Sequence, residues 1–234
     1  MTMEPNNAMM LKACLFDLDG VIVDTARYHF IAWRQIATEL GFDFTEEHNE
    51  RLKGVSRTRS LEILLEIGGL SLDDEARTHL AQKKNSLYLQ YVLKMRPDEV
   101  LPGAREFLTD CRNHRLGTGL GSASKNAITI LNLLQITDLF DVIVDGNKVI
   151  KAKPDPEVFL TGARDLGVLP RQCVVFEDAA AGIEAAVAAG MFSVGIGDPA
   201  VLAKANFVTS GLKDLSVATL LARLEHQSSR ASAA

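Results

Sequence analysis

Two aspartates stand two residues apart where an apolar run ends. Residues 11–16 are typical of a short buried strand in a parallel sheet, and Asp17 and Asp19 follow them before Gly20 allows a tight turn. Ligands of open α/β sheets bind beyond the carboxyl ends of the strands. Because a buried charge is costly unless it is compensated, two carboxylates here indicate a bound cation or a reacting group. An aspartate that only caps the turn would explain one of them.

Three later segments offer partners for these carboxylates. Residues 121–126 are small or polar and lead into a helix-like stretch, so they could form a phosphate cradle or simply cap that helix. Lys153 stands just before a rigid turn at Pro154, where a lone lysine is usually solvated. Residues 173–176 are another apolar run, which ends in Glu177 and Asp178. Each signal is weak alone, but four in this order, three of them at strand ends, indicate one shared site.

The order of these segments resembles the haloacid-dehalogenase-type (HAD-like) phosphotransferase superfamily. Asp17-Leu18-Asp19-Gly20 matches its first motif, Ser122 its second, Lys153 its third and Glu177-Asp178 its fourth. Residues outside these motifs resemble the β-phosphoglucomutase family within it: Thr25, His29, Trp33, Leu52-Lys53-Gly54-Val55-Ser56-Arg57, Lys84-Asn85 and Ser122-Ala123-Ser124-Lys125-Asn126. The resemblance covers nearly the whole chain, apart from the first few residues and the tail.

The resemblance implies phosphoryl transfer through the first two acids. Such a reaction needs an in-line nucleophile, neutralisation of the phosphoryl charge and a proton shuttle. Asp17 is the expected nucleophile and forms an aspartyl-phosphate, whereas Asp19 is the expected general acid–base. Dehalogenation at carbon requires only the nucleophile, so Asp19 favours phosphate chemistry. Thr25 and His29 join the expected catalytic group, and His29 with Lys84 resembles the cap group that positions the second acid.

A magnesium ion and one lysine are the expected counter-charges. Mg²⁺ suits all-oxygen ligation shared with a phosphate, and the expected ligands are the Asp17 carboxylate, the Asp19 backbone carbonyl and Asp178. Glu177 would bind the ion directly or through water; the alternative is an acid placed at a helix start by the dipole. Lys153 would neutralise the transferring phosphate, and the Ser122 hydroxyl with the Ala123 N–H would orient it.

A mutase must also hold the phosphate that is not reacting. Arg57 could bind it bidentately from the cap, while Ser124, Lys125 and Asn126 could close the same site from the core. The alternative for Arg57 is a surface charge, although a helix start is unfavourable for a cation. Lys84 shares an apolar helix face, from which it either snorkels to solvent or faces the cleft. The other expected substrate contacts are Trp33, which packs and shapes the cleft, and Lys53, Gly54, Val55 and Ser56.

The resemblance thus implies a phosphomutase that interconverts β-D-glucose 1-phosphate and D-glucose 6-phosphate. The route would run through the aspartyl-phosphate enzyme and β-glucose 1,6-bisphosphate, which also serves as primer. One alternative is a Mg²⁺-dependent sugar-phosphate phosphatase with the same core, which has no need of two phosphate grips. Another is a non-catalytic sugar-phosphate-binding protein, which the intact acids and Lys153 disfavour.

The elements that must position these residues form an α/β core with an insertion. Five apolar runs are typical of buried strands: 11–16, 116–120, 142–144, 174–176 and 192–196. Helix-like stretches separate the last four, which predicts a doubly wound parallel sheet, the Rossmann-like core of the superfamily. Residues 26–95 show helical periodicity and no convincing strand. We therefore expect a core domain of residues 1–25 and 96–234 and an all-helical cap domain of residues 26–95, hinged near Thr25 and near 97–102.

Local signals predict where several helices begin and end. In the cap we expect helices over 26–40, over 57–67 and over 72–95, the last one with Ser71 as its capping residue. In the core, Asp155 is expected to cap a helix that begins at Pro156.

Composition is that of an ordinary globular enzyme. The 234 residues are 47% hydrophobic and carry a net charge of −5, without a basic stripe, so neither nucleic acid nor an anionic membrane is an expected partner. The three cysteines lack a C-x-x-C spacing and are expected to be reduced. Residues 1–10 lack the pattern of a signal peptide. We expect a cytoplasmic monomer that acts on a small sugar phosphate.

Overall fold

A six-stranded parallel sheet forms the centre of the molecule. The computed structural model describes residues 10–231, so the expectation about a signal peptide lies largely outside the described residues. The strands are β1 (Ala13–Phe16), β2 (Gly117–Gly121), β3 (Val142–Val144), β4 (Cys173–Glu177), β5 (Phe192–Ile196) and β6 (Phe207–Thr209). Their spatial order is β3-β2-β1-β4-β5-β6, with all neighbours parallel. The order reverses between β1 and β4, which is where ligands bind in such sheets.

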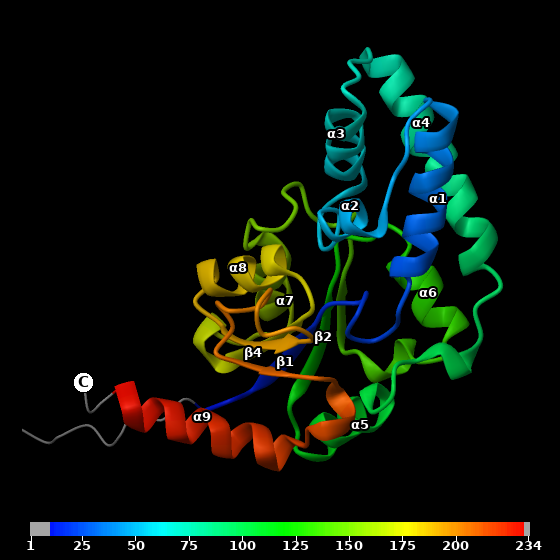
Figure 1. The fold of residues 1–234 in the computed structure, drawn as a ribbon. Helices are drawn as coiled ribbons and strands as arrows, with labels where there is room; N and C mark the ends of the chain where they lie inside the picture. Colours follow the sequence, from blue (N-terminus) through cyan, green and yellow to red (C-terminus); the bar gives the residue numbers. More distant parts are fainter. Residues whose placement is uncertain (1–9, 232–234) are drawn as a thin grey trace, which may run out of the picture.

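Helices cover both faces of this sheet, so the predicted doubly wound architecture is confirmed (Figure 1). The core helices are α5 (Ala104–Asn113), α6 (Ala127–Leu133), α7 (Glu157–Asp165), α8 (Ala180–Ala188) and α9 (Val217–Ala231). Alternate residues of β1 pack into different clusters: Phe16 packs with α5, α6 and α9, and Leu15 packs with α7 and α8. This alternation follows from the period of two along a strand, and it explains why β1 is apolar throughout.

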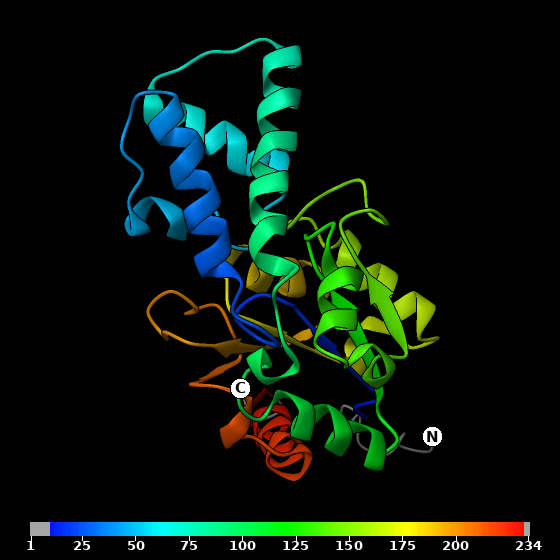
Figure 2. The same ribbon diagram turned by 90° about the vertical axis from the view of Figure 1, so that its right-hand side faces the viewer.

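Four helices lie between β1 and α5 and rise above the sheet: α1 (Ala26–Glu39), α2 (Glu46–Glu50), α3 (Arg57–Gly68) and α4 (Asp74–Val92). We call them the cap helices. They share a hydrophobic cluster of their own, which includes Trp33, Ile36, Phe44 and Leu64. Figure 2 shows α4 running from the far end of this region down to the core. No strand occurs among residues 26–95, as expected, whereas the exact domain boundaries stay a prediction.

Two linkers join the cap helices to the core. Val23 forms a bridge with Val100, and the Leu101 N–H donates to the Ile22 carbonyl at 2.9 Å, so the linkers run side by side. Glu99 lies in a short 3₁₀ helix of the second linker and accepts hydrogen bonds from Arg27 at 2.6 Å and from Tyr28 at 2.8 Å. These hydrogen bonds tie the start of α1 to the second linker.

Several local predictions need correction. The helix expected over 72–95 begins at Asp74, and its cap is Asp73, which accepts from the Ala76 N–H at 2.8 Å, so Ser71 is not the cap. Asp155 does accept from the Glu157 N–H at 3.0 Å, but α7 begins at Glu157 and not at Pro156. Helix α2 and strand β6 were not predicted, because one is a short polar helix and the other has only three residues.

Candidate active site

The first two acids lie at the carboxyl end of β1, beside the end of β4. The Asp17 N–H donates to the Phe176 carbonyl of β4 at 2.9 Å, which continues the parallel ladder one residue beyond β1. Asp17 is almost fully buried, and one of its carboxylate oxygens accepts from the Asp19 N–H at 3.1 Å. Gly20 then turns the chain with a φ of +74°, and a β-carbon there would lie 2.1 Å from a carboxylate oxygen of Asp178. Only glycine allows these two acidic segments to approach so closely.

Lys153 joins the first and fourth motifs through buried ion pairs. Its Nζ donates to Asp17 Oδ1 at 2.6 Å and also bonds Glu177 Oε1. Burial alone would lower the pKa of Lys153, but the carboxylates of Asp17 and Glu177 hold that pKa above its usual range. The lysine is therefore a fixed positive charge beside the expected nucleophile, and not a solvated loop charge.

The acids beside Lys153 carry surplus negative charge. Carboxylate oxygens of Asp17, Glu177 and Asp178 lie within 4.8 Å of one another. Burial, together with the charges of Glu177 and Asp17, raises the pKa of Asp178 well above its usual range. One lysine cannot compensate three carboxylates, and three hard oxygen donors at this spacing fit a Mg²⁺ ion. Glu177 also accepts from the Ala179 N–H at 3.2 Å, so the expected helix-start contact is present as well.

The Ser122 loop approaches from the end of β2. Ser122 is 1% exposed and its hydroxyl accepts from the Ser124 N–H at 3.1 Å. The Ser124 hydroxyl in turn accepts from the Asn126 N–H at 3.2 Å, while α6 has no side-chain cap of its own. Asn147, which sequence analysis missed, donates to the Lys125 carbonyl at 3.1 Å and braces the loop from the end of β3. The only signal for Asn147 was its place just after a strand.

The second acid, Asp19, is held by Thr25 of the first linker, which in turn is held by Tyr88 of α4. The Thr25 hydroxyl donates to Asp19, and the buried Tyr88 hydroxyl donates to Thr25 Oγ1 at 3.2 Å. Desolvation and the charge of Asp17 raise the pKa of Asp19 to about 7, although the Thr25 hydrogen bond opposes this shift. A carboxyl group that titrates near neutral pH is suited to giving and taking a proton. Tyr88 was not among the predicted residues, although it lies one turn after Lys84.

Lys84 faces the cleft and does not snorkel to solvent. It is 2% exposed, and its Nζ bonds His29 Nδ1 at 2.6 Å. The same Nζ lies 4.9 Å from the ring centre of Trp33 and 4.7 Å from that of Tyr88. Burial and the charge of Arg57 lower the pKa of Lys84 to about 7. Burial, Lys84 and Arg57 likewise hold the pKa of His29 well below its usual range, so the imidazole is neutral and accepts the bond.

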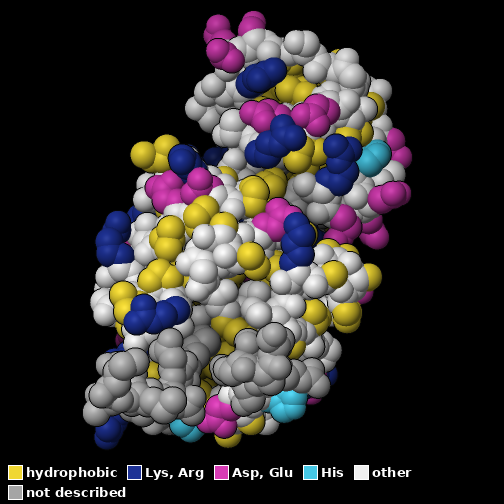
Figure 3. All heavy atoms as spheres, turned by 90° about the vertical axis from the view of Figure 1, so that its left-hand side faces the viewer, with side chains coloured by type: hydrophobic (Ala, Val, Ile, Leu, Met, Phe, Trp, Pro, Cys, Tyr) yellow, Lys and Arg dark blue, Asp and Glu magenta, His cyan; other side chains and the backbone are white. Residues whose placement is uncertain are grey.

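Arg57 lines the cleft and donates to an amide oxygen. Arg57 starts α3, and its Nη2 donates to Asn85 Oδ1 at 2.7 Å; Asn126 Nδ2 donates to the same oxygen at 3.0 Å. Among the described residues, no carboxylate lies within 4.0 Å of the charged atoms of Arg57, Lys84 or Lys125. Figure 3 shows Lys and Arg side chains on both sides of the indentation between the cap helices and the core.

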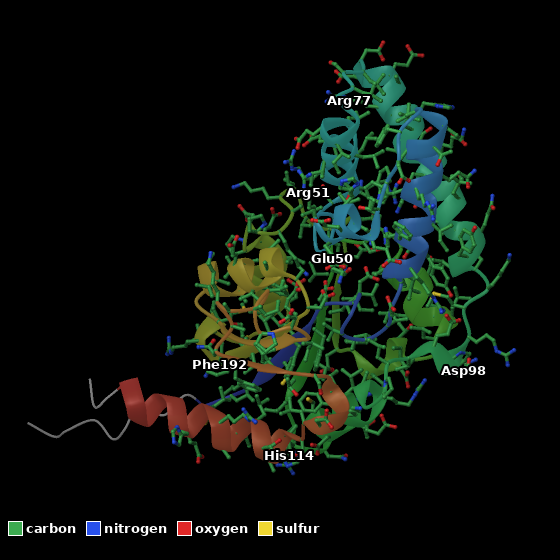
Figure 4. The ribbon with its side chains drawn as sticks, in the orientation of Figure 1. Glu50, Arg51, Arg77, Asp98, His114 and Phe192 are labelled. Carbon is green, nitrogen blue, oxygen red and sulfur yellow. The ribbon has the colours of Figure 1, made fainter. Side chains whose placement is uncertain are left out.

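One cleft of about 840 Å³ gathers most of the predicted residues. Its lining includes every predicted site residue except Thr25 and Glu177, which are fully buried behind it. Lys53 pairs with Glu50 at 2.9 Å, and Ser56 uses its hydroxyl to cap α3, so these two side chains have structural partners too. In Figure 4, Glu50 lies at the end of the cap helices nearest the core and Arg77 lies near their far end.

The fold and the site together define the class of protein. Residues 11–190 match the family described as haloacid dehalogenase-like hydrolase, and the chain belongs to that family. It is 43% identical over 212 residues to the β-phosphoglucomutase of Bacillus subtilis (strain 168), a match that covers 90% of this chain and 94% of that protein.

Two further relatives are a mutase and a phosphatase. The crystal structure of β-phosphoglucomutase from Clostridium difficile matches with a TM-score of 0.90 and 42% identity, over 93% of this chain and 99% of that one. A phosphorylated carbohydrates phosphatase of Thermotoga maritima is 34% identical over 186 residues, 77% of this chain and 82% of the phosphatase. Within the described residues, no helix has the length and hydropathy needed to cross a bilayer.

Proposed function

We propose that the chain is a phosphomutase that interconverts β-D-glucose 1-phosphate and D-glucose 6-phosphate. The observation that carries the proposal is the division of the cleft into two ends. Asp17, Lys153 and Asp178 form a reaction end, whereas Arg57 and Lys125 line the same cleft without a carboxylate in ion-pair distance among the described residues, which suits a second anion. A sugar that carries phosphate at one position and reacts at another fits both ends. The identity to β-phosphoglucomutases over nearly the whole chain supports the same activity.

Asp17 is the group that takes the phosphate. Its buried carboxylate attacks phosphorus, the Asp17–phosphorus bond forms and the bond from phosphorus to the sugar oxygen breaks. Lys153 is already hydrogen-bonded to Asp17 and offsets the negative charge that would otherwise repel the phosphate. The Ser122 hydroxyl and the Ala123 N–H, at the end of the neighbouring strand β2, orient the phosphoryl oxygens.

Asp19 moves the proton. It gives a proton to the departing sugar oxygen and takes one from the sugar hydroxyl that attacks the aspartyl-phosphate in the reverse sense. The Thr25 hydroxyl and the Tyr88 hydroxyl behind it fix the orientation of the Asp19 carboxyl. We propose that β-glucose 1,6-bisphosphate is the intermediate and that it turns over between two half-reactions, because a single Asp17 serves both positions of the sugar.

A magnesium ion fits the acids of the reaction end. We propose Asp17, Asp178 and the Asp19 carbonyl as its ligands, with Glu177 bound directly or through water. When bound, the ion would supply positive charge to the phosphoryl oxygens, as the Lys153 ammonium group does. Glu177 is engaged by both Lys153 and the Ala179 N–H, so its first task is to hold Lys153 in place.

The rival activity is hydrolysis of the same phosphoenzyme by water. The phosphatase relative shares the fold, and water needs only the reaction end. Arg57 and Lys125, with the Asn126 amide beside them, favour the mutase because they would bind the phosphate that does not react. Closure of the cap helices over the cleft would also exclude water from the aspartyl-phosphate.

One pair of assays tests the proposal. β- and α-glucose 1-phosphate are each supplied with a bisphosphate primer, and glucose 6-phosphate formation is measured beside phosphate release. We expect rapid isomerisation of the β anomer alone and slow phosphate release. Asp17→Ala should accept no phosphate from acetyl phosphate, whereas Asp19→Ala should still accept it slowly, because acetate needs no proton to leave. Phosphate release without isomerisation would establish the phosphatase instead.

A further inference from the structure

Asn49 of α2 carries a buried polar atom that the protein does not pair. The residue is 8% exposed, and its Oδ1 is the one buried side-chain nitrogen or oxygen without a hydrogen-bond partner among the described residues. Its backbone is paired, since the Asn49 N–H donates to the Thr45 carbonyl at 3.1 Å and the Leu52 N–H donates to the Asn49 carbonyl at 2.9 Å. A buried acceptor without a donor is destabilising, so we expect its donor to come from a molecule that binds beside it.

Asn49 belongs to the wall of the cleft. It lines the cleft together with Trp33 and Leu52, which are members of the hydrophobic cluster of the cap helices. The next residue, Glu50, lies at the end of the cap helices nearest the core (Figure 4). The segment expected to contact the substrate begins only three residues later, at Leu52. Asn49 itself was not among the predicted site residues.

The cleft has many hydrogen-bond donors, and two of its neutral acceptors are already used. The lysines and the arginine that line it can only donate. The amide oxygen of Asn85 accepts from two donors, and His29 Nδ1 bonds Lys84. Each ring hydroxyl of a sugar carries a proton that needs an acceptor when water is excluded. The amide oxygen of Asn49 is suited to accept such a proton.

We propose that Asn49 determines sugar specificity, because its amide oxygen accepts a hydrogen bond from a ring hydroxyl of the bound sugar phosphate. This inference rests on the proposed function, since it takes a sugar phosphate as the ligand. A neutral acceptor suits the task, because a carboxylate in the same place would repel the phosphate groups of the ligand. A sugar phosphate without that hydroxyl leaves the oxygen unpaired and binds more weakly.

The test combines a deletion on the ligand with a deletion on the protein. Dissociation constants are measured by isothermal titration calorimetry, with Mg²⁺ and without a bisphosphate primer, for glucose 6-phosphate and for its 2-deoxy, 3-deoxy and 4-deoxy analogues. In the parent protein, one analogue should bind at least about tenfold more weakly than glucose 6-phosphate. In Asn49→Leu this ratio should fall below about twofold for the same analogue, because the acceptor is gone. Asn49→Ala removes the same oxygen without added bulk and should give the same result.

Two further variants separate a direct contact from a structural role. Asn49→Asp keeps an acceptor in the same place, so it should keep the ratio between the ligands while it binds all of them more weakly. Asn113→Leu, at an exposed residue of α5 outside the cleft, makes the same chemical change as Asn49→Leu and should behave as the parent protein. A structural role of Asn49 would weaken the binding of every ligand by one factor and leave the ratios unchanged.

The outcomes separate this inference from the proposed function. Ratios in Asn49→Leu and Asn49→Ala that equal those of the parent protein would overturn the contact, even if the parent protein isomerises glucose phosphates. A parent protein that binds all four ligands equally would overturn it as well. If the ratio collapses in both variants but the parent protein does not isomerise, the contact of Asn49 with the hydroxyl stands and the mutase assignment fails.

Discussion

At the scale of single residues, the site combines buried carboxylates that one lysine cannot neutralise. Asp178 is half-buried, and desolvation together with its acidic neighbours raises the pKa of its carboxyl group well above the usual range. When a carboxyl group has a higher pKa in the folded than in the unfolded protein, the protein becomes less stable as the pH rises through the unfolded pKa. Asp178 therefore destabilises the metal-free protein at neutral pH. A bound cation would remove this penalty.

We therefore expect Asp178→Asn to have opposite effects on stability and activity. The metal-free variant should be more stable than the parent protein at pH 7, Mg²⁺ should no longer raise its melting temperature, and Mg²⁺-dependent turnover should be lost. Thermal unfolding with and without Mg²⁺, beside a turnover assay, measures all three. Asp138→Asn, at an exposed aspartate outside the cleft, is the control. A Mg²⁺-dependent melting temperature that persists in Asp178→Asn would remove Asp178 from the ligand set.

Lys84 is a buried cation, so its charge also destabilises the folded protein. Its folded pKa, lowered to about 7 by burial and Arg57, lies below the unfolded value of about 10.4. Between these values the unfolded chain binds more protons, so the stability of the parent protein rises with pH. Lys84→Met should therefore be more stable than the parent by about 1–2 kcal/mol at pH 6.5, after the loss of the bond to His29 is counted. This advantage should shrink or reverse at pH 9.5. Urea unfolding at both pH values measures it, and a difference independent of pH would contradict the assignment.

At the scale of elements, small residues in the helices make room for the acids. A β-carbon on Gly182 of α8 would lie 1.9 Å from the Glu177 carboxylate, so α8 packs directly on the residue that holds Lys153. This contact explains why α8 has a glycine at position 182.

Gly182→Ala tests this packing. Alanine normally stabilises a helix interior by about 1 kcal/mol relative to glycine. Here the collision should destabilise the protein by about 1–3 kcal/mol instead, as overpacking of a filled core does. Gly162→Ala in α7 is the matched control, since its new methyl group would meet only the flexible end of Leu15 at 3.1 Å. Urea unfolding of both variants decides; a stabilised Gly182→Ala would show that the Glu177 side chain moves freely.

The elements that sequence analysis found are those with a strong local signal. Strand β1 is an uninterrupted apolar run followed by acids, and α3 is followed by Gly69, which adopts the left-handed conformation typical of a helix end. Helix α2 has five polar residues and β6 is a half-buried edge strand, so neither shows a periodic pattern. These two elements depend on tertiary contacts, which the local sequence does not show.

The same reason limits what sequence can say about the site. Asp17, Asp19, Lys153 and Asp178 were identifiable because each follows a recognisable motif. The bridge from Arg57 through Asn85 to Asn126 joins residues separated by 28 and 41 positions, and it depends on how the cap helices sit over the core. No spacing along the chain predicts such a contact.

At the scale of the whole molecule, the cap helices and the core each contribute one side of the proposed binding site for the second phosphate. The cap helices have their own hydrophobic cluster, but Tyr88, Val92 and Met95 pack with the core cluster close to the linkers. We expect the cap to turn about these linkers and to close when a phosphate joins Arg57 to the core. Discrimination between the sugar hydroxyl and water would then depend on Arg57.

Arg57→Ala should impair reactions that need the second phosphate and spare those that do not. A charge-assisted contact contributes about 1.5–3 kcal/mol, so isomerisation should fall by roughly tenfold to a hundredfold. Arg57→Lys should recover part of this loss, because a point charge cannot reproduce the planar fork. Phosphorylation of Asp17 by acetyl phosphate, which has no second phosphate to bind, should be nearly unchanged, and hydrolysis should rise relative to isomerisation. Both reactions are measured on the parent protein and the two variants. Equal losses in both would indicate general damage to the cap, and no loss in either would leave Arg57 outside the site.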